Sequence, residues 1–558
     1  MIKEGKDVLN KYGDYQAYSF NIFDTILTRI TGSPEGIFTI MQQRIQNDVS
    51  FASLPQSLSC DFARIRRNYE DYSRKHLPEN RGEITLEDIY IEIAQNYALT
   101  EAQIETLKTL ELEIEYNYSI ALTDTIEEIK VLVSIGKKVL LISDIYLPYS
   151  AVKKMLNKAD MMFARLPTYL SSECQKTKSE GTLFTFVQGK EHLTLSSWIH
   201  IGDNKFSDYK IPKSLGLQAF HKQLVKETFF EKYLDKELKY NVNAQVFLGS
   251  SKVARLYDKQ SFMYRVGCNY AGPILTAFAC WILEQCKLRC IDTIYFIARD
   301  GYIVKRIVDI IIRHCQIPIR TDYIYGSRKT WLVNWRQNDD ADLLKKYLLQ
   351  EIPKGSKNFA FVDSFGSGYT LDNITELMQD FWQLPITAFY IYRGTRKKGT
   401  ETKNLVTKID CMHFLDIWDN IELFCKAPEG QCLAYKEINN KVVPVCEESE
   451  GKLIQEFGFD DYLNGIVNFA LSFILTEPDW KYNKSSIQDI LFWYIKRINE
   501  FPDNDLLQFL LYFPRFEERK KLKYTDLGRM EREIELKLKK FKYLEKVIEK
   551  KKLFNLLK

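Results

Sequence analysis

Small polar and acidic residues follow three apolar segments that lie far apart in the chain. Each apolar segment has the length and composition of a buried strand. Because parallel strands end at one edge of their sheet, we expect these residues to meet there. Such a set of side chains could hold a phosphate group or a metal ion. The residues are Asn21 and Asp24 after Tyr18–Phe20, Ser143 and Asp144 after Val139–Ile142, and Asp203 and Asp208 after Trp198–Gly202.

A second set of strand-end residues occurs in the middle of the chain. The glycine-rich turn Gly366-Ser367-Gly368 stands between an expected strand and an expected helix, where backbone N–H groups can bind phosphate. Arginines and aspartates at the same edge suit a phosphorylated sugar, a nucleotide sugar or a phosphodiester. Structural ion pairs such as Arg299–Asp363 are the alternative. The other members are Arg299 and Asp300 after Thr293–Ile297, Ser327 and Arg328 after Tyr323–Tyr325, Asp363 after Phe359–Val362, and Arg393 after Ile386–Tyr392.

Strands, polar loops and helices alternate around both sets, which predicts an α/β protein with more than one domain. The length of 558 residues and the 45% hydrophobic content fit two to four globular domains. Residues 33–120 have helical spacing and interrupt the first set as a helical insertion, which we call the cap. We expect a Rossmannoid domain over 1–230, a second doubly wound α/β domain over 231–450, and a helical region over 451–558. Arg66 and Arg67 in the cap are expected on a solvated helix face.

Four short motifs carry a resemblance to a known superfamily. They are Ser-Phe-Asn-Ile-Phe-Asp-Thr at 19–25, Ser-Asp-Ile-Tyr-Leu-Pro at 143–148, His-Ile-Gly-Asp-Asn at 200–204 and Ala-Arg-Asp-Gly-Tyr at 298–302. Together they resemble the haloacid dehalogenase (HAD) superfamily, in a large two-part branch similar to proteins of bacterial surface-glycan gene clusters. The resemblance covers roughly residues 14–440.

The resemblance implies a magnesium-dependent phosphohydrolase that forms an aspartyl-phosphate. On that reading Ser143 and Lys178 bind the phosphoryl oxygens, and Asp203 and Asp208 are the acids on the metal side. Asp144 would bind substrate or metal, or cap its loop. The superfamily's nucleophilic aspartate corresponds to Asn21, whose neutral amide is a very poor nucleophile and carries no charge for the metal.

We therefore expect a HAD-like protein with impaired chemistry and weakened Mg²⁺ binding. It would bind a phosphorylated or nucleotide-linked sugar in bacterial glycan biosynthesis, and its second domain could be a transferase-like catalytic module. One alternative is an active Mg-dependent sugar-phosphate phosphatase that uses Asp24, or Asn21 after deamidation. Another is a non-catalytic scaffold for membrane-associated glycan enzymes.

Charge is concentrated at the C-terminal end. Residues 515–558 contain sixteen Lys and Arg against eight Asp and Glu, although the whole chain is only +4. Residues 531–558 have the spacing of a basic amphipathic helix that could lie on a membrane surface or dock with a protein partner. No nucleic-acid motif accompanies this charge.

No signal peptide is apparent, so we expect a cytoplasmic protein with reduced cysteines. The apolar run Ala271–Leu283 is too short to cross a bilayer, so we expect a buried helix there.

Overall fold

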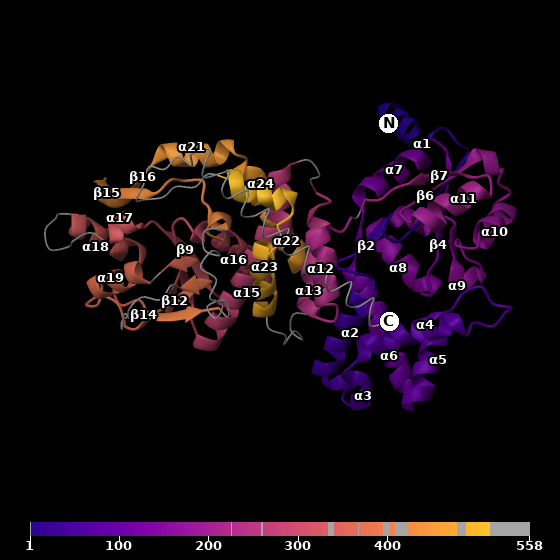
Figure 1. Cartoon of the computed structure of the whole chain (residues 1–558), viewed down its shortest axis with the longest axis horizontal. Coiled ribbons are helices and arrows are strands. Elements are labelled where there is room, and N and C mark those ends of the chain that lie inside the picture. Colours follow the sequence, from indigo (N-terminus) through magenta and orange to yellow (C-terminus); the bar gives the residue numbers. More distant parts are fainter. Residues whose placement is uncertain are drawn as a thin grey trace, which may run out of the picture. The chain divides into compact units, whose positions relative to one another are not determined.

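A computed structural model describes residues 2–224, 226–257, 261–332, 340–366, 368–393, 402–407, 421–476, 487–500 and 502–513. The chain forms two compact units (Figure 1). The first comprises Met1–Leu256 with Leu475–Ser485, and the second comprises Tyr257–Ile474 with Ser486–Lys558. The first unit extends past the expected boundary at residue 230. Ser367 and the basic segment 531–558 lie outside the described residues.

The first unit is built on a five-stranded sheet in the order β5-β4-β1-β6-β7, with every neighbouring pair parallel. The central strand β1 pairs with β4 and β6, which come more than a hundred residues later, so the three expected strands are adjacent. This confirms the α/β prediction and brings their carboxyl ends to one edge. The strands are β1 Ala17–Phe20, β4 Lys138–Ser143, β5 Thr168–Leu170, β6 Trp198–Gly202 and β7 Gln218–His221.

Helices cover this sheet because their apolar faces have no other surface to bury. Phe184 and Val187 of α10 (Thr182–Glu191) pack with Leu140, Ile142 and Trp198 in one buried cluster. The other helices of this part of the unit alternate with the strands along the chain. They are α1 Ile2–Tyr12, α7 Thr123–Ser134, α8 Tyr149–Ala159, α9 Ser171–Cys174 and α11 Ile211–Ser214.

A helical cap interrupts the sheet between two short antiparallel strands, β2 Leu27–Arg29 and β3 Ser119–Ala121. Because β2 and β3 pair, the chain leaves and re-enters the sheet domain at one place. Thr85 and Thr100 begin the last two cap helices with reciprocal capping boxes. The cap helices are α2 Gly36–Asn47, α3 Gln56–Ser59, α4 Phe62–Lys75, α5 Leu86–Tyr97 and α6 Glu101–Tyr118.

Arg66 of the cap is fully buried, so the expected solvated position is wrong for this residue. Its guanidinium donates two hydrogen bonds to Glu111, at 2.7 and 2.8 Å, and lies over the rings of Phe38 and Tyr146. Tyr146, in the loop after β4, also donates to Glu111 at 3.0 Å. This charge pair therefore joins the cap to the loop that follows Ser143.

The second unit contains another five-stranded parallel sheet, in the order β14-β12-β10-β8-β9. The helical stretch Phe262–Arg289, which ends in α15 Gly272–Arg289, is long and apolar enough to cross a membrane, but its most apolar window is entirely buried in the protein. The buried-helix expectation is thus confirmed. The strands are β8 Thr293–Ile297, β9 Arg320–Ile324, β10 Phe359–Val362, β12 Ile386–Tyr390 and β14 Thr402–Val406.

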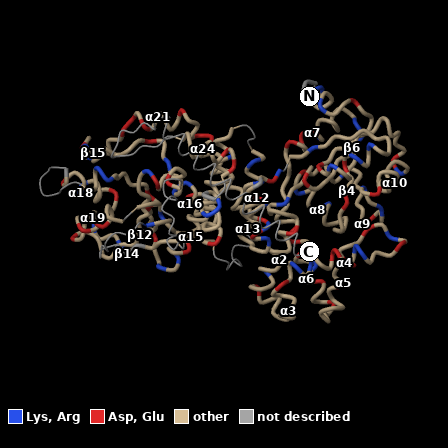
Figure 2. The backbone as a smooth tube through the Cα atoms, in the orientation of Figure 1, with Lys and Arg blue, Asp and Glu red and all other residues tan. Residues whose placement is uncertain are grey.

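Further helices and a hairpin complete the described part of this unit. Helix α16 Gly301–Cys315 follows β8, and the hairpin pairs β15 Cys432–Ile438 with β16 Lys441–Cys446. Acidic and basic residues alternate along the backbone of both units (Figure 2). The described cysteines are free thiols. The later helices are α21 Glu448–Glu456, α22 Phe459–Ile474, α23 Ile487–Glu500 and α24 Asn504–Tyr512.

Gly249 allows helix α13 (Val242–Ala254) to approach the chain that leads into the cap. A Cβ atom there would lie 2.3 Å from the carbonyl carbon of Ile30 and 2.4 Å from the nitrogen of Thr31. We expect Gly249→Ala to destabilise the first unit by about 1–3 kcal/mol through overpacking. Gly189→Ala, in α10 with open space around its Cβ, should stabilise by up to about 1 kcal/mol. Urea unfolding of both variants tests this, and a Gly249→Ala protein as stable as the wild type would contradict it.

Candidate functional site

The side-chain amide of Asn21 lies at the carboxyl end of β1 and makes four hydrogen bonds. Its Oδ1 accepts from Lys178 Nζ at 2.9 Å and from Ser143 Oγ at 3.2 Å. Its Nδ2 donates to Asp203 Oδ1 at 2.8 Å and to the backbone carbonyl of Phe23 at 2.9 Å. Turning the amide over would place NH₂ against the ammonium of Lys178, which has only donors. The orientation of the amide is therefore fixed by its neighbours.

Lys178 is held in place by a second acceptor. Its Nζ donates to Asp208 Oδ1 at 2.5 Å, and both side chains are almost fully buried. Burial opposes ionisation of Asp208, but the charges of Lys178 and the contact with His200 outweigh it and keep the pKa of Asp208 well below its usual value. Gly202 makes room for this carboxylate, because a Cβ there would lie 2.5 Å from Asp208 Cγ.

A buried chain of hydrogen bonds supports Asp208 from below the site. Trp198 Nε1 donates to Ser19 Oγ at 2.8 Å, so the Ser19 proton is available for His200 Nδ1, also at 2.8 Å. His200 Nε2 then donates to Asp208 Oδ1 at 3.2 Å. Burial lowers the pKa of His200, which keeps the ring neutral. His200 is thus a core histidine, as its strand position suggests, and it also orients a site residue.

Sequence reasoning missed Ser19 as part of the site. Ser19 and His200 are direct register partners on β1 and β6. The available signal was a polar residue inside each of two apolar strands, shortly before Asn21 and Asp203. Such a pair has to find its hydrogen bonds inside the protein, because no water reaches it.

Asp203 and Asp24 occupy the other side of the Asn21 amide. Burial, together with the charges of Asp24 and Asp208, raises the pKa of Asp203 from 3.8 to about 6. Asp24 has a left-handed backbone, with φ of 53°, and its carboxylate accepts from Thr28 Oγ1 at 2.6 Å. Asn21, rather than Asp24, is the residue in contact with Ser143 and Lys178.

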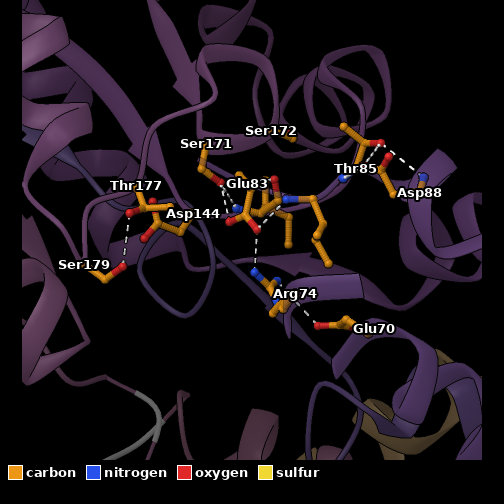
Figure 3. Close-up of polar contacts among 12 residues, drawn as sticks. Glu70, Arg74, Glu83, Thr85, Asp88, Asp144, Ser171, Ser172, Thr177 and Ser179 are labelled. Atoms are coloured by element: carbon orange, nitrogen blue, oxygen red, sulfur yellow. Dashed lines mark hydrogen bonds and ion pairs between the residues drawn. The ribbon is translucent and has the colours of Figure 1, made fainter. Parts of the chain in front are cut away.

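Asp144 positions the loop that carries Lys178. Its carboxylate accepts the backbone N–H of Lys178 at 2.8 Å and also that of Ser179, while burial raises its pKa. The close-up shows Asp144 beside Thr177 and Ser179 (Figure 3). These bonds favour the loop-capping interpretation of Asp144 over direct ligand binding.

The cap is tied to the same loops through Glu83. Its carboxylate accepts from Ser171 Oγ at 3.0 Å and from Arg74 of α4, and Figure 3 shows Glu83 between these two side chains. Ser171 Oγ in turn accepts the backbone N–H of Ile145 at 2.8 Å. The cap, the loop after β4 and the start of α9 therefore form one hydrogen-bonded network above the sheet edge.

A cavity of about 540 Å³ lies between the cap and the sheet edge of the first unit. Asn21, Ser143, Lys178, Asp203 and Asp208 all line it, so the structure brings these five predicted residues together. The cap and the β2 region contribute paired charges, including Arg29–Glu115 at 2.7 Å and Arg67–Glu35 at 3.0 Å. The other charged lining residues are Asp24, Glu70, Arg74 and Asp144.

The residues of the second predicted site lie at the carboxyl edge of the second sheet. β8 and β10 are adjacent, so Asp300 and Asp363 follow neighbouring strands. Burial and mutual repulsion raise the pKa of Asp363 well above its usual value, and burial, with the charge of Glu422, raises that of Asp300 to about 7. Arg299 forms an ion pair with Glu450 of α21, not with Asp363.

The remaining second-site residues take structural positions. Ser327 is the N-cap of α17 (Arg328–Trp331) and donates to the Cys432 carbonyl at 2.7 Å. Gly366 pairs with Arg393 in two short parallel strands, β11 Phe365–Gly366 and β13 Tyr392–Arg393. Gly368 has φ of 77° and precedes α19 Tyr369–Leu377, close to the Arg393 guanidinium. Phosphate binding by this turn stays a prediction.

The donor set in the first unit does not fit a resident magnesium ion. Mg²⁺ requires oxygen ligands, whereas Asn21 presents an NH₂ group to Asp203 and to the Phe23 carbonyl. The carboxylate of Asp208 is already bonded by Lys178, His200 and the backbone N–H of Asn204. Within the described ranges, no three His, Cys, Asp or Glu side chains are placed to hold a metal ion.

No family model matches this sequence, and no curated protein sequence matches it either. Among solved structures, a dehalogenase is 15% identical to this chain, with a TM-score of 0.25. The match covers 37% of this chain and 84% of the dehalogenase chain. A hydrolase from Pseudomonas syringae is 12% identical, with coverages of 37% and 83% and a TM-score of 0.23. The HAD hydrolase YfnB from Bacillus subtilis, bound to magnesium, is 12% identical, with coverages of 38% and 89% and a TM-score of 0.26. Each of these matches covers 37–38% of this chain.

Asn21→Asp should create a requirement for a divalent cation. The new carboxylate would turn an oxygen toward Asp203 Oδ1 and the Phe23 carbonyl, which the amide now bridges at 2.8 and 2.9 Å. We expect the variant to unfold several degrees below the wild type without metal and to recover with excess Mg²⁺, while the wild type does not respond. Asn204→Asp is the control, since its side chain caps backbone N–H groups of the same cavity. If Mg²⁺ changes the unfolding temperatures of the wild type and of the Asn21→Asp variant equally, the prediction is refuted.

The raised pKa of Asp203 predicts a pH-dependent contribution to stability. A carboxyl group with a folded pKa of about 6 stabilises the folded state below pH 4, and this contribution is lost as the pH rises through 6. Relative to Asp203→Asn, the wild type should therefore lose about 3 kcal/mol of unfolding free energy between pH 4 and pH 8. Denaturant unfolding of both proteins across this range measures the difference. A difference that does not change with pH would show that Asp203 titrates normally.

Proposed function

We propose that the first unit binds a phosphorylated ligand in a HAD-like pocket and does not form an aspartyl-phosphate. The observation that carries this proposal is the amide of Asn21, which stands between the donors Ser143 and Lys178 and the acceptor Asp203. The parallel sheet edge, the cap and the two buried donors support binding of a phosphorylated ligand, and the neutral amide at position 21 supports the absence of an aspartyl-phosphate step.

Ser143 and Lys178 are suited to bind a phosphoryl group. Both side chains are buried, both line the cavity, and both point their donors at one oxygen, Asn21 Oδ1. A phosphoryl oxygen entering the cavity offers the same kind of acceptor with more negative charge. The Lys178 ammonium and the Ser143 hydroxyl can therefore turn toward it, with Asp208 and Asp144 keeping Lys178 in place.

The same contacts explain why covalent chemistry is not expected. Asn21 Oδ1 is a neutral amide oxygen that already accepts two hydrogen bonds, and Nδ2 donates both of its protons. Neither atom offers the charged lone pair that attacks phosphorus in an aspartyl-phosphate mechanism. Asp24 does not replace it, because its carboxylate is bonded to Thr28 and does not contact Ser143 or Lys178.

The ligand that we propose is a phosphorylated or nucleotide-linked sugar, as in bacterial glycan biosynthesis. A cavity of about 540 Å³ has room for a sugar phosphate, and its paired Arg–Glu groups offer donors and acceptors to hydroxyl groups. The sequence motifs support the glycan association, and Asp300 and Asp363 of the second unit remain a separate predicted site.

Phosphatase assays with a panel of sugar phosphates test this function. The wild type should be silent, and Asn21→Asp with Mg²⁺ should gain activity; loss of nucleophile-type residues in other enzymes lowers the rate by about 10⁴–10⁶-fold. Ser143→Ala should weaken binding of a sugar phosphate in calorimetry without restoring turnover. Wild-type turnover equal to that of Asn21→Asp would overturn the proposal in favour of an active phosphatase.

A scaffold role through residues 531–558 lies outside the described residues and stays a prediction. It requires that the full chain binds anionic liposomes or a partner enzyme and that deletion of these residues abolishes the binding.

A further inference from the structure

The first unit contains a second cavity, of about 490 Å³, with three lysines and three acidic residues in its lining. We propose that this lysine-lined cavity is a separate subsite for a phosphate-type oxyanion. It goes beyond the proposed function, which concerns the pocket around Asn21. The lining residues are Asp24, Gly32, Pro34, Asp203, Gln223, Lys226, Glu227, Lys232 and Lys252.

Lys252 is the main reason for this assignment. It lies on α13, is only 8% exposed, and its ammonium makes no hydrogen bond or ion pair with any residue that the structure describes. Burying an unpaired ammonium group destabilises a folded protein. Lys252 therefore places an unfavourable charge in the wall of this cavity.

The neighbouring carboxylates act on Lys252 without pairing with it. Burial lowers the pKa of Lys252, and Asp24, Glu227 and Glu231 oppose that effect from a distance. Asp24 is bonded to Thr28, and Glu231 is bonded to Arg255 and to the Thr228 backbone. Two of these acids are thus bonded elsewhere. The third, Glu227, lines the same cavity, and burial raises its pKa, but no hydrogen bond or ion pair joins it to Lys252.

Two further lysines stand at exposed positions of the same lining. Lys232 lies on α12 (Phe229–Glu237), and Lys226 lies in the chain that precedes it. Three ammonium groups from separate places around one cavity match the several oxygens of a phosphate group, each of which can accept more than one hydrogen bond. Exposed Lys226 and Lys232 would attract the anion from solvent, and buried Lys252 would make the strongest single contact with it.

The two cavities share part of their wall. Asp24, Pro34 and Asp203 line both the lysine-lined cavity and the pocket around Asn21. An oxyanion held by Lys252 would thus lie in a cavity that Ser143 and Lys178 do not line. A ligand with two separated anionic groups, or two separate anions, could be held at once.

Titration calorimetry of the full chain with inorganic phosphate tests the subsite. We expect Lys252→Met to weaken phosphate binding at this subsite at least tenfold, whereas Lys236→Met, at an exposed position of α12 outside the lining, should have no effect. Lys252→Met should also raise the unfolding temperature in phosphate-free buffer, because it removes an unpaired buried charge. The stabilised protein then cannot owe its loss of binding to misfolding.

The outcomes separate this inference from the proposed function. Phosphate binding that Lys252→Met weakens and Ser143→Ala leaves intact supports the subsite alone. Binding that only Ser143→Ala weakens overturns the subsite and leaves the pocket around Asn21 standing. No phosphate binding by the wild type, or a Lys252→Met protein that is less stable than the wild type, also overturns the subsite, since Lys252 would then have a structural partner.

Discussion

The site in the first unit depends on the polarity of one amide. Asn21 presents an oxygen to two donors, Ser143 and Lys178, and an NH₂ group to two acceptors, Asp203 and the Phe23 carbonyl. Each contact satisfies a group that would otherwise be buried without a partner. A carboxylate at the same position satisfies the first pair but repels the second, and it therefore needs a cation. The residue type at position 21 thus decides whether this sheet edge needs a metal.

The surroundings keep the amide in place from both sides. The bonds from Trp198 through Ser19 and His200 to Asp208 fix the anchor of Lys178 inside the core. Above the sheet, Arg66 and Glu83 join the cap to the loops that follow β4 and precede α9. A pocket built this way is already ordered before any ligand arrives, which favours tight binding because little side-chain freedom remains to be lost.

Much of this site could be predicted from the sequence because its residues follow strands. Ser143 and Asp203 stand directly after apolar runs, and parallel pairing of those runs with β1 requires their side chains to meet. The partners within the site could not be assigned in the same way. Asp208 was expected on the metal side, yet it accepts from Lys178, and a choice between a cation and an ammonium partner depends on distances that no local pattern contains.

Residues that enter the site from outside the strand ends were harder to recognise. Arg66 has the sequence surroundings of an exposed helical arginine, and only the packing of α6 against it shows Glu111 as its partner. Lys252 belongs to a helix with no motif, and its importance follows from its burial. In the second unit, the Gly366–Gly368 turn reads as a phosphate loop, but pairing of Gly366 with Arg393 gives it a structural role as well.

The most direct test is a crystal structure of the wild-type protein grown with manganese, with anomalous diffraction measured at the manganese edge. The account predicts no anomalous peak between Asn21, the Phe23 carbonyl and Asp203, with Asn21 Nδ2 still about 2.8 Å from Asp203 Oδ1. A peak at that point, with Asn21 turned so that its oxygen faces the ion, would contradict it.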